Sequence, residues 1–257
     1  MFKFRFNATN KYGVAFAMLK FLSGKCAELG PETMCQLAQY RYKVFIQKLG
    51  WSLPTSGGVE SDEFDHADTL YVVAVDGSGG VTGCARLLPT NEPYLLGEVF
   101  PGLMGGAQPP CLPDVWELSR FALSAPLGES LSVEESWRNT CLMMAEIVRV
   151  SQARGAGRLI AFSVLGNERL LRRMGVNVHR VAAPQLIDGK LTLPFWIELD
   201  RQTCAALNID VLTEESTHLA PCGVVPAMDW HRTPSGCHEN GLPVYLSQQI
   251  GGHYGGA

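Results

Sequence analysis

Apolar positions along the chain change between helical and strand-like spacing from residue 31 onward. Over residues 31–51 they recur at helical spacing, and Gly50 ends this predicted helix. Apolar runs at 70–76 and 81–88 flank the sequence GSGG, which supplies the positive φ angles of a tight hairpin. A further apolar run at 115–123 follows a stretch rich in proline and glycine, and it predicts a buried strand.

The second half of the chain continues this pattern. Residues 132–157 predict a helix that begins with a capping box, because Glu135 follows Ser132 by three residues. A short helix is predicted over 167–175, with Asn167 as its N-cap and a glycine as its stop. Three more apolar stretches predict strands at residues 158–164, 176–182 and 193–200. This order predicts an α/β sandwich around a mixed sheet.

The two ends of the chain differ from its centre. Residues 1–30 combine basic residues with an apolar stretch that Lys20 interrupts, which favours an amphipathic helix over a signal peptide. From residue 203 to 257 the chain is rich in glycine, proline and polar residues, and we expect a partly irregular extension. A central domain over 31–202 is therefore predicted between them. No apolar run is long enough for membrane insertion.

Composition narrows the possible partners. The 257 residues are 46% hydrophobic and 18% charged, which is typical of a globular protein. A net charge of −4 gives no field that favours nucleic acid, so an anionic partner would need a local basic patch. The eight cysteines include no CxxC pair, which predicts reduced thiols, a cytoplasmic location and no metal site. The one cluster worth testing has no known zinc-finger spacing: Cys222, His231, Cys237 and His238.

Two charges lie inside the predicted strand at 115–123. Burying Glu117 and Arg120 costs several kcal/mol unless each is paired and hydrogen-bonded. Either they form an ion pair that satisfies itself, or both face a cleft that holds a ligand. Residues three apart in a regular strand point to opposite faces, so a shared cleft requires a β-bulge. We predict this bulge near Leu118–Ser119.

Three other stretches carry polar or aromatic residues of the same kind. The predicted helix over 31–51 carries Arg41, Phe45 and Trp51 toward its end. The acidic loop at 52–68 carries Asp62 and Asp65, and the hairpin strand at 81–88 carries Arg86. Taken singly, each has a plain structural explanation: a core aromatic, solvated acids, a solvent-facing arginine. Taken together they predict a pocket for a zwitterion or a cation, in which acids hold an ammonium or sulfonium group between aromatic faces.

Four motifs make a specific resemblance. RYKVFIQKLGW (41–51), DEFD (62–65), GCARLLPT (83–90) and WELSRFA (116–122) resemble the acyl-homoserine-lactone autoinducer synthases of the LuxI type, over roughly residues 35–200. All polar signature positions are present: Arg41, Phe45, Trp51, Asp62, Asp65, Arg86, Glu117 and Arg120. The resemblance implies a GNAT-like fold, a three-layer sandwich around a mixed, twisted sheet.

The resemblance also implies an activity. Such an enzyme joins the amine of S-adenosylmethionine to an acyl chain carried on acyl carrier protein, then closes a lactone and releases methylthioadenosine. The product is a quorum-sensing signal, and neither cofactor nor metal is required. Glu117 is the expected general base, because burial raises a carboxyl pKa toward neutrality. Arg86 and Arg120 are expected to order carboxylates or hold the substrate carboxylate, and Asp62 and Asp65 to attract the cation.

Two further expectations concern the acyl donor. In the family, a threonine in the strand at 158–164 accompanies 3-oxo chains, and Ser163 stands near that position, which favours an unsubstituted or hydroxylated chain. The positive excess over 149–180 is either a solvated face or a docking patch for acidic acyl carrier protein. The predicted docking residues are Arg149, Arg154, Arg172 and Arg173. The sequence QARGAG (152–157) is expected to stop a helix rather than bind pyrophosphate.

Two alternatives stay open from sequence. One is a general N-acyltransferase of the GNAT type that uses acyl-CoA on another amine, and the other is a small-molecule binder without catalysis. The acidic loop and aromatic pair favour a sulfonium substrate over the first. Acyl chain length, the identity of the donor and the oligomeric state are not predicted.

Overall fold

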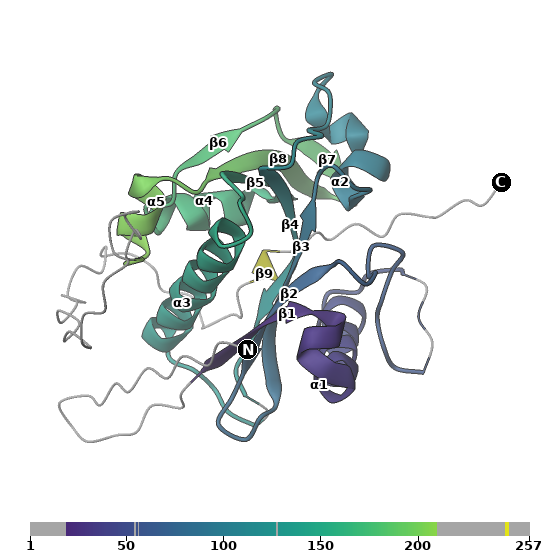
Figure 1. Ribbon diagram of the computed structural model, residues 1–257, viewed down its shortest axis with the longest axis vertical. Helices are drawn as coiled ribbons and strands as arrows, with labels where there is room; N and C mark the ends of the chain where they lie inside the picture. Colours follow the sequence, from purple (N-terminus) through teal and green to yellow (C-terminus); the bar gives the residue numbers. More distant parts are fainter. Residues whose placement is uncertain (1–18, 54, 56, 127, 210–244, 247–257) are drawn as a thin grey trace.

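A mixed β-sheet with helices on both faces forms the core of the computed structural model (Figure 1). The structure describes residues 19–53, 55, 57–126, 128–209 and 245–246. The strand order is β1-β2-β3-β4-β5-β8-β6, with β7 paired to β8 and β9 paired to β4. The strands are β1 Lys20–Lys25, β2 Leu70–Val75, β3 Val81–Pro89, β4 Val115–Leu123, β5 Arg158–Val164, β6 Val178–Arg180, β7 Gln185–Ile187, β8 Lys190–Glu198 and β9 Tyr245–Leu246.

Helices form the outer two layers. They are α1 Cys26–Arg41, a π-helix Tyr42–Lys48, α2 Leu95–Glu98, a 3₁₀ helix Pro101–Met104, α3 Val133–Gln152, α4 Leu165–Arg173 and α5 Arg201–Ala206. Figure 1 shows α1 and α3 on opposite sides of the sheet. The predicted α/β sandwich is confirmed, and so is the capping box at the start of α3. None of the described helices has the length and hydropathy needed to cross a bilayer.

Alternation along β2 divides the core between the two faces. Val72 and Ala74 pack in the cluster that contains the buried residues of α3 and α4. Tyr71 and Val73 pack in the cluster that contains the buried residues of α1 and the π-helix. Because side chains of a strand point alternately to its two faces, one short strand serves both layers.

Strands β4 and β5 are parallel neighbours for only part of their length. Their pairing runs from Val115 to Glu117, and β5 then continues beside β8 alone. Farther along β4, Phe121 and Ala122 pair with β9. The charged residues of β4 therefore lie where the two central strands separate.

A bulge interrupts β4 at this point. Arg86 pairs with Ser119 and Cys84 pairs with Ala122, so the single residue Ala85 lies opposite two residues of β4. Arg120 has a φ of 52°, in the left-handed region. The predicted bulge is confirmed, but it lies just after Ser119 rather than at Leu118–Ser119. The left-handed residue is what turns the side chain of Arg120 back to the face that carries Ser119.

The expected N-terminal helix is wrong over Lys20–Lys25, which form edge strand β1 in register with β2. Hydrogen bonding to a distant strand decides this conformation, and local periodicity does not report it. The following helix begins at Cys26 instead of residue 31, and Gly30, with a φ of 81°, kinks it before Pro31. Residues 1–18 lie outside the described residues.

Two smaller expectations also need correction. Asn167 is not an N-cap, because α4 begins at Leu165 and the Asn167 side chain donates from Nδ2 to the Ser163 hydroxyl at 2.7 Å. The boundary expected at residue 202 falls inside α5, and Leu207 is buried in the main core. The Cys/His cluster at 222–238 lies outside the described residues.

Candidate functional site

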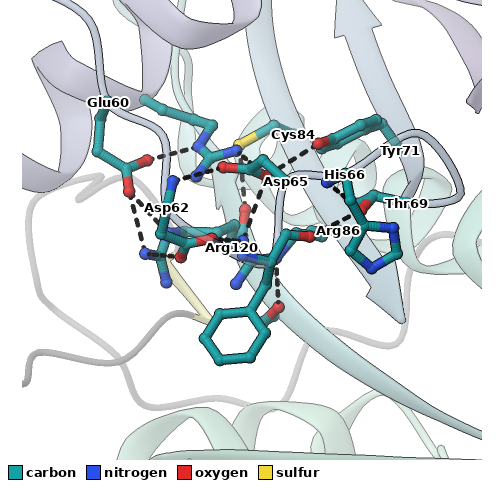
Figure 2. Close-up of polar contacts among 12 residues, drawn as sticks. Glu60, Asp62, Asp65, His66, Thr69, Tyr71, Cys84, Arg86 and Arg120 are labelled. Atoms are coloured by element: carbon teal, nitrogen blue, oxygen red, sulfur yellow. Dashed lines mark hydrogen bonds and ion pairs between the residues drawn. The ribbon is translucent and has the colours of Figure 1, made fainter. Parts of the chain in front are cut away.

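Three arginines from three separate elements meet beside the bulge. Arg41 ends α1, Arg86 is central in β3, and Arg120 is the bulge residue of β4. All three are at least 96% buried, so each guanidinium needs anionic partners close by. The acidic segment before β2 supplies them (Figure 2).

Three carboxylates of that segment each bridge two arginines. Glu60 accepts from Arg41 Nε at 2.5 Å and from Arg120 Nη2 at 3.0 Å. Asp62 accepts from Arg86 Nη1 and, at 2.7 Å, from Arg120 Nη2. Asp65 accepts from Arg41 Nη1 at 2.7 Å and from Arg86 Nη1 at 3.2 Å. The result is a closed ring of three cations and three anions, in which every charge has two partners.

The arginines hold two of the ring carboxyls, Glu60 and Asp65, ionised. Burial alone would raise the pKa of Glu60, but Arg120 and Arg41 lower it to about 2. Burial opposes ionisation of Asp65 as well, and Arg41 and Arg86 nevertheless keep its pKa well below the usual range. Tyr71 donates to Asp65 at 2.8 Å, and burial together with that carboxylate raises the tyrosine pKa, so its hydroxyl stays protonated.

An aromatic pair covers one side of the ring. Phe45 and Trp51 stack with ring centroids 4.7 Å apart, and the Arg120 guanidinium lies 5.1 Å from the Trp51 ring. Phe45 lies in the π-helix that continues α1, and the amide of Trp51 donates to the Phe45 carbonyl at 2.9 Å. π-Helices are rare and often occur at functional sites, because the wider turn redirects side chains. Here the π-helix places Phe45, and the residues after it place Trp51, beside the arginine at the bulge.

Glu117 stands beside the ring but outside it. Its Oε2 accepts from the backbone amide of Leu96 in the first turn of α2 at 2.7 Å, and it makes no ion pair within the described residues. It shares a sheet face with Ser119, whose hydroxyl accepts from Arg86 Nε at 3.0 Å. Burial raises the pKa of Glu117, although the Leu96 amide and Arg86 oppose the rise. A self-satisfied pair between Glu117 and Arg120 is therefore not what the strand contains.

Several buried polar atoms of this region have no hydrogen-bond partner among the described residues. They include Nη2 of Arg41, Nη2 of Arg86, Nε1 of Trp51 and Oε1 of Glu117. Buried polar groups are normally satisfied, so three donors and one acceptor in one region fit a polar ligand that both accepts and donates. A substrate with a carboxylate and an amine has that character.

The expected site residues divide into a cluster and a remainder. The structure brings together Arg41, Phe45, Trp51, Asp62, Asp65, Arg86 and Arg120, with Glu117 beside them. Ser163 is not part of the cluster. It follows Leu159 and Ala161 on the face of β5 that packs against α3 and α4, and its hydroxyl bonds Asn167. Its part in acyl-chain recognition stays a prediction.

The arginines expected to dock a carrier protein lie away from the cluster, on and after α3 and on α4. Arg149 pairs with Glu146, Arg154 with Glu28, and Arg172 with Glu168. Arg173 lies with its guanidinium 4.5 Å from the Trp137 ring. These contacts offset part of their charge, and the docking role stays a prediction.

Sequence reasoning missed Glu60, Tyr71 and the hydroxyl of Ser119. Glu60 is fully buried, whereas Glu63 in the DEFD motif is exposed. The available signal was the spacing of Glu60 and Asp62, which are two residues apart and therefore on one side of an extended segment. Among the described residues, His, Cys, Asp and Glu side chains form no group of three or more suited to bind a metal ion.

Comparisons with known proteins agree with this site. The sequence profile of the family described as autoinducer synthase matches residues 27–207. An acyl-homoserine-lactone synthase of Ralstonia solanacearum is 47% identical over 177 residues, which cover 67% of this chain and 85% of the relative.

Solved structures give the same result. TofI, crystallised in a ternary complex with an inhibitor and MTA, is 41% identical with a TM-score of 0.64, covering 74% of this chain and 97% of its own. BjaI, described as a CoA-dependent acyl-homoserine lactone synthase and crystallised with SAM and isopentyl-CoA, is 25% identical with a TM-score of 0.65, covering 75% of this chain and 88% of its own. Because the profile spans well over half of the sequence and the signature side chains converge, the chain belongs to the autoinducer synthase family and is an acyltransferase with a GNAT-like fold.

Proposed function

We propose that this enzyme acylates the amine of S-adenosylmethionine with an acyl thioester and then closes the homoserine lactone, releasing methylthioadenosine. The product would be a diffusible quorum-sensing signal. Support comes from the family, from the relatives crystallised with MTA and with SAM, and from the polar character of the site. The observation that carries the proposal is Glu117, a fully buried carboxyl with a raised pKa, one fixed oxygen and one oxygen without a partner among the described residues.

Glu117 is the proposed general base. The amine of S-adenosylmethionine is protonated at neutral pH and must lose a proton before it attacks a thioester. A carboxylate with a raised pKa accepts that proton near neutral pH, directly or through one water molecule. The Leu96 amide holds Oε2, which leaves Oε1 to face the substrate. Attack then forms the amide bond, breaks the carbonyl–sulfur bond and releases the donor thiol.

The arginines are proposed to hold the substrate carboxylate. Nη2 of Arg41 and Nη2 of Arg86 are buried donors without a partner among the described residues, and charge-assisted hydrogen bonds to a carboxylate suit them. Asp62 and Asp65 each bond two arginines, so their first task in this proposal is to fix the guanidinium groups rather than to attract the cation. Lactone closure then needs the carboxylate oxygen to displace neutral methylthioadenosine from the carbon bonded to the sulfonium sulfur.

Acyl carrier protein is the proposed donor. Elements α4 and β6 carry one acid, Glu168, and four exposed arginines, which gives them a local positive excess on an acidic protein: Arg169, Arg172, Arg173 and Arg180. An acidic carrier would be steered to such a surface. The CoA dependence of BjaI makes acyl-CoA the alternative donor.

The purified enzyme tests these proposals directly. It is incubated with S-adenosylmethionine and either acyl carrier thioesters or acyl-CoA thioesters of several chain lengths, and the products are identified by mass spectrometry. We expect equal amounts of acyl-homoserine lactone and methylthioadenosine, with a higher kcat/KM for the carrier thioester. Glu117→Gln keeps an oxygen for the Leu96 amide, and it should lower kcat by about 10²- to 10⁴-fold.

Three results would count against the proposal. Acylation of another amine without methylthioadenosine would indicate a general N-acyltransferase. Binding of S-adenosylmethionine without turnover of any donor would leave a small-molecule binder. Full activity of Glu117→Gln would remove Glu117 from the role of base.

A further inference from the structure

The left-handed conformation of Arg120 is a feature that the ion pairs alone do not explain. A φ of 52° is disfavoured for a residue with a β-carbon, and such conformations persist only where surrounding contacts fix them. The bulge takes Arg120 out of the regular β3–β4 register, whose pairs stop at Ser119 and resume at Ala122. Contacts to the Arg120 backbone therefore decide where its guanidinium lies.

One such contact comes from the neighbouring strand. The thiol of Cys84 donates to the carbonyl oxygen of Arg120, with Sγ and oxygen 3.0 Å apart (Figure 2). Cys84 is 1% exposed and packs with Phe45, Trp51 and Ala122. Burial raises the pKa of this thiol to about 12, so it stays a protonated donor throughout the neutral range. A cysteine suits this place because it combines a small apolar body with a weak hydrogen-bond donor.

We propose that Cys84 is a positioning residue for S-adenosylmethionine binding, which fixes the Arg120 carbonyl and thereby holds the Arg120 guanidinium between Glu60, Asp62 and the Trp51 ring. This inference rests on the proposed function, because it assigns the substrate to that cluster. Without the thiol, the backbone of the bulge samples more conformations. The hydrogen bonds from the Arg120 guanidinium to Glu60 Oε1 and Asp62 Oδ2 are then formed for a smaller fraction of the time. The substrate site is then assembled for a smaller fraction of the time, which weakens binding.

Three variants separate positioning from packing. Cys84→Ala removes the donor and some volume, Cys84→Ser restores a donor, and Cys84→Val fills the space without a donor. Cys204→Ala is the matched control, because Cys204 is also 1% exposed but packs in the other core cluster, where its sulfur accepts from Gln152. Calorimetry measures the Kd for S-adenosylmethionine, kinetics give KM for both substrates, and urea unfolding gives stability.

The expected result is specific to one substrate. Cys84→Ala and Cys84→Val should raise the Kd for S-adenosylmethionine roughly three- to tenfold, the equivalent of one lost hydrogen bond, and leave KM for the acyl donor unchanged. Cys84→Ser should stay within about twofold of the wild type, given that a hydroxyl also donates. Cys204→Ala should change stability and leave the Kd unchanged.

Contrary results are equally clear. A Kd of Cys84→Ala equal to that of the wild type overturns the inference, as does a loss in Cys84→Ser that matches the loss in Cys84→Ala. If Cys84→Ala does not fold, the comparison of Cys84→Val with Cys84→Ser decides in the same way. A wild-type protein that does not bind S-adenosylmethionine would instead overturn the proposed function on which the inference rests.

Discussion

Glu60 shows at the residue scale how the arginine cluster contributes to stability. It is fully buried and bonds both Arg41 and Arg120. Glu60→Gln leaves two buried guanidinium groups short of one negative charge, and it should lower the free energy of unfolding at pH 7 by about 3–5 kcal/mol. Urea unfolding measures this change. Glu63→Gln is the matched control, because Glu63 is exposed three residues away, and it should leave the free energy unchanged.

The same carboxyl predicts a pH dependence. The folded-state pKa of Glu60, about 2, lies below its usual value of 4.5. Its contribution to stability is therefore complete above pH 4.5 and is lost as the pH falls toward 2. The difference between wild type and Glu60→Gln should shrink over that window. A constant difference from pH 7 to pH 2 would show that Glu60 acts through packing rather than charge.

For Glu117 we predict that stability depends on pH with the opposite sign. Burial raises its pKa, so the folded protein holds the proton more tightly than the unfolded chain does. Ionisation of Glu117 then costs stability as the pH rises above about 4.5. Glu117→Gln should be more stable than the wild type at pH 8, by about 0.5–2 kcal/mol, with the gain vanishing near pH 4, although it loses activity. Urea unfolding at both pH values measures this. If Glu117→Gln is less stable than the wild type at pH 8, ionisation of the buried Glu117 does not cost stability and the prediction is wrong.

At the element scale, the acidic segment before β2 both orders and covers the arginines. Its turn is fixed by hydrogen bonds from the Asp62 amide to Asp65 Oδ2 at 2.8 Å and from the Phe64 amide to Asp62 Oδ1 at 3.0 Å. The acids and arginines of the cluster expose at most 10% of their side-chain surface. A substrate that contacts the guanidinium groups must therefore displace part of the covering chain.

Hydrogen exchange tests whether this segment opens. We expect amides of residues 58–68 to exchange through local opening in the free protein, and to exchange about tenfold more slowly with saturating S-adenosylmethionine, because the bound state opens less often. Amides at the centre of α3, around Met143, pack on the opposite sheet face and should not respond. Equal slowing in both segments would indicate general stabilisation, and no slowing in residues 58–68 would contradict opening there.

Much of this element-scale structure was predictable, for identifiable reasons. Apolar periodicity located the hairpin, β4 and α3, because those elements bury one continuous face each. The odd separation of Glu117 and Arg120 implied a bulge, but its position depends on which residue adopts a left-handed φ, and sequence pattern does not report that. Strand β1 was missed because pairing with β2 sets its conformation.

The candidate site was predictable to a similar extent. Family motifs identified the three arginines and two of their acids, whereas Glu60 lay outside the DEFD motif. Its burial depends on Arg41 and Arg120 arriving from elements far apart in the sequence. The hydrogen bond from Leu96 to Glu117 was also out of reach, because a backbone amide leaves no trace in residue identity.

At the scale of the whole molecule, net charge and local charge oppose each other. The chain carries a net charge of −4, which repels an acidic carrier protein, while α4 and β6 present four arginines on one face of the sheet. Glu168 already bonds Arg172 and Arg180, so part of that positive charge is fixed within the protein. Productive docking then depends on the remaining local excess, which acts over roughly one Debye length, about 8 Å at physiological salt.

Neutralising this excess tests donor choice. Arg172→Gln combined with Arg173→Gln should raise KM for the acyl carrier thioester about five- to tenfold and leave KM for S-adenosylmethionine unchanged. The reason is that Arg172 pairs with Glu168 and Arg173 lies over the Trp137 ring, and neither partner belongs to the buried cluster. The difference should disappear at 0.5 M salt, where exposed charges are screened. Steady-state kinetics at two salt concentrations measure both effects.

The matched control changes net charge by the same amount elsewhere. Lys20 on β1 and Lys43 in the π-helix are exposed, and Lys20→Gln combined with Lys43→Gln should leave both KM values unchanged. If the control raises the carrier KM equally, overall charge governs encounter and α4 is no docking surface. If the arginine variant raises KM for both substrates, the loss lies in the fold. Only a rise confined to the carrier thioester and abolished by salt assigns this face to the acyl donor.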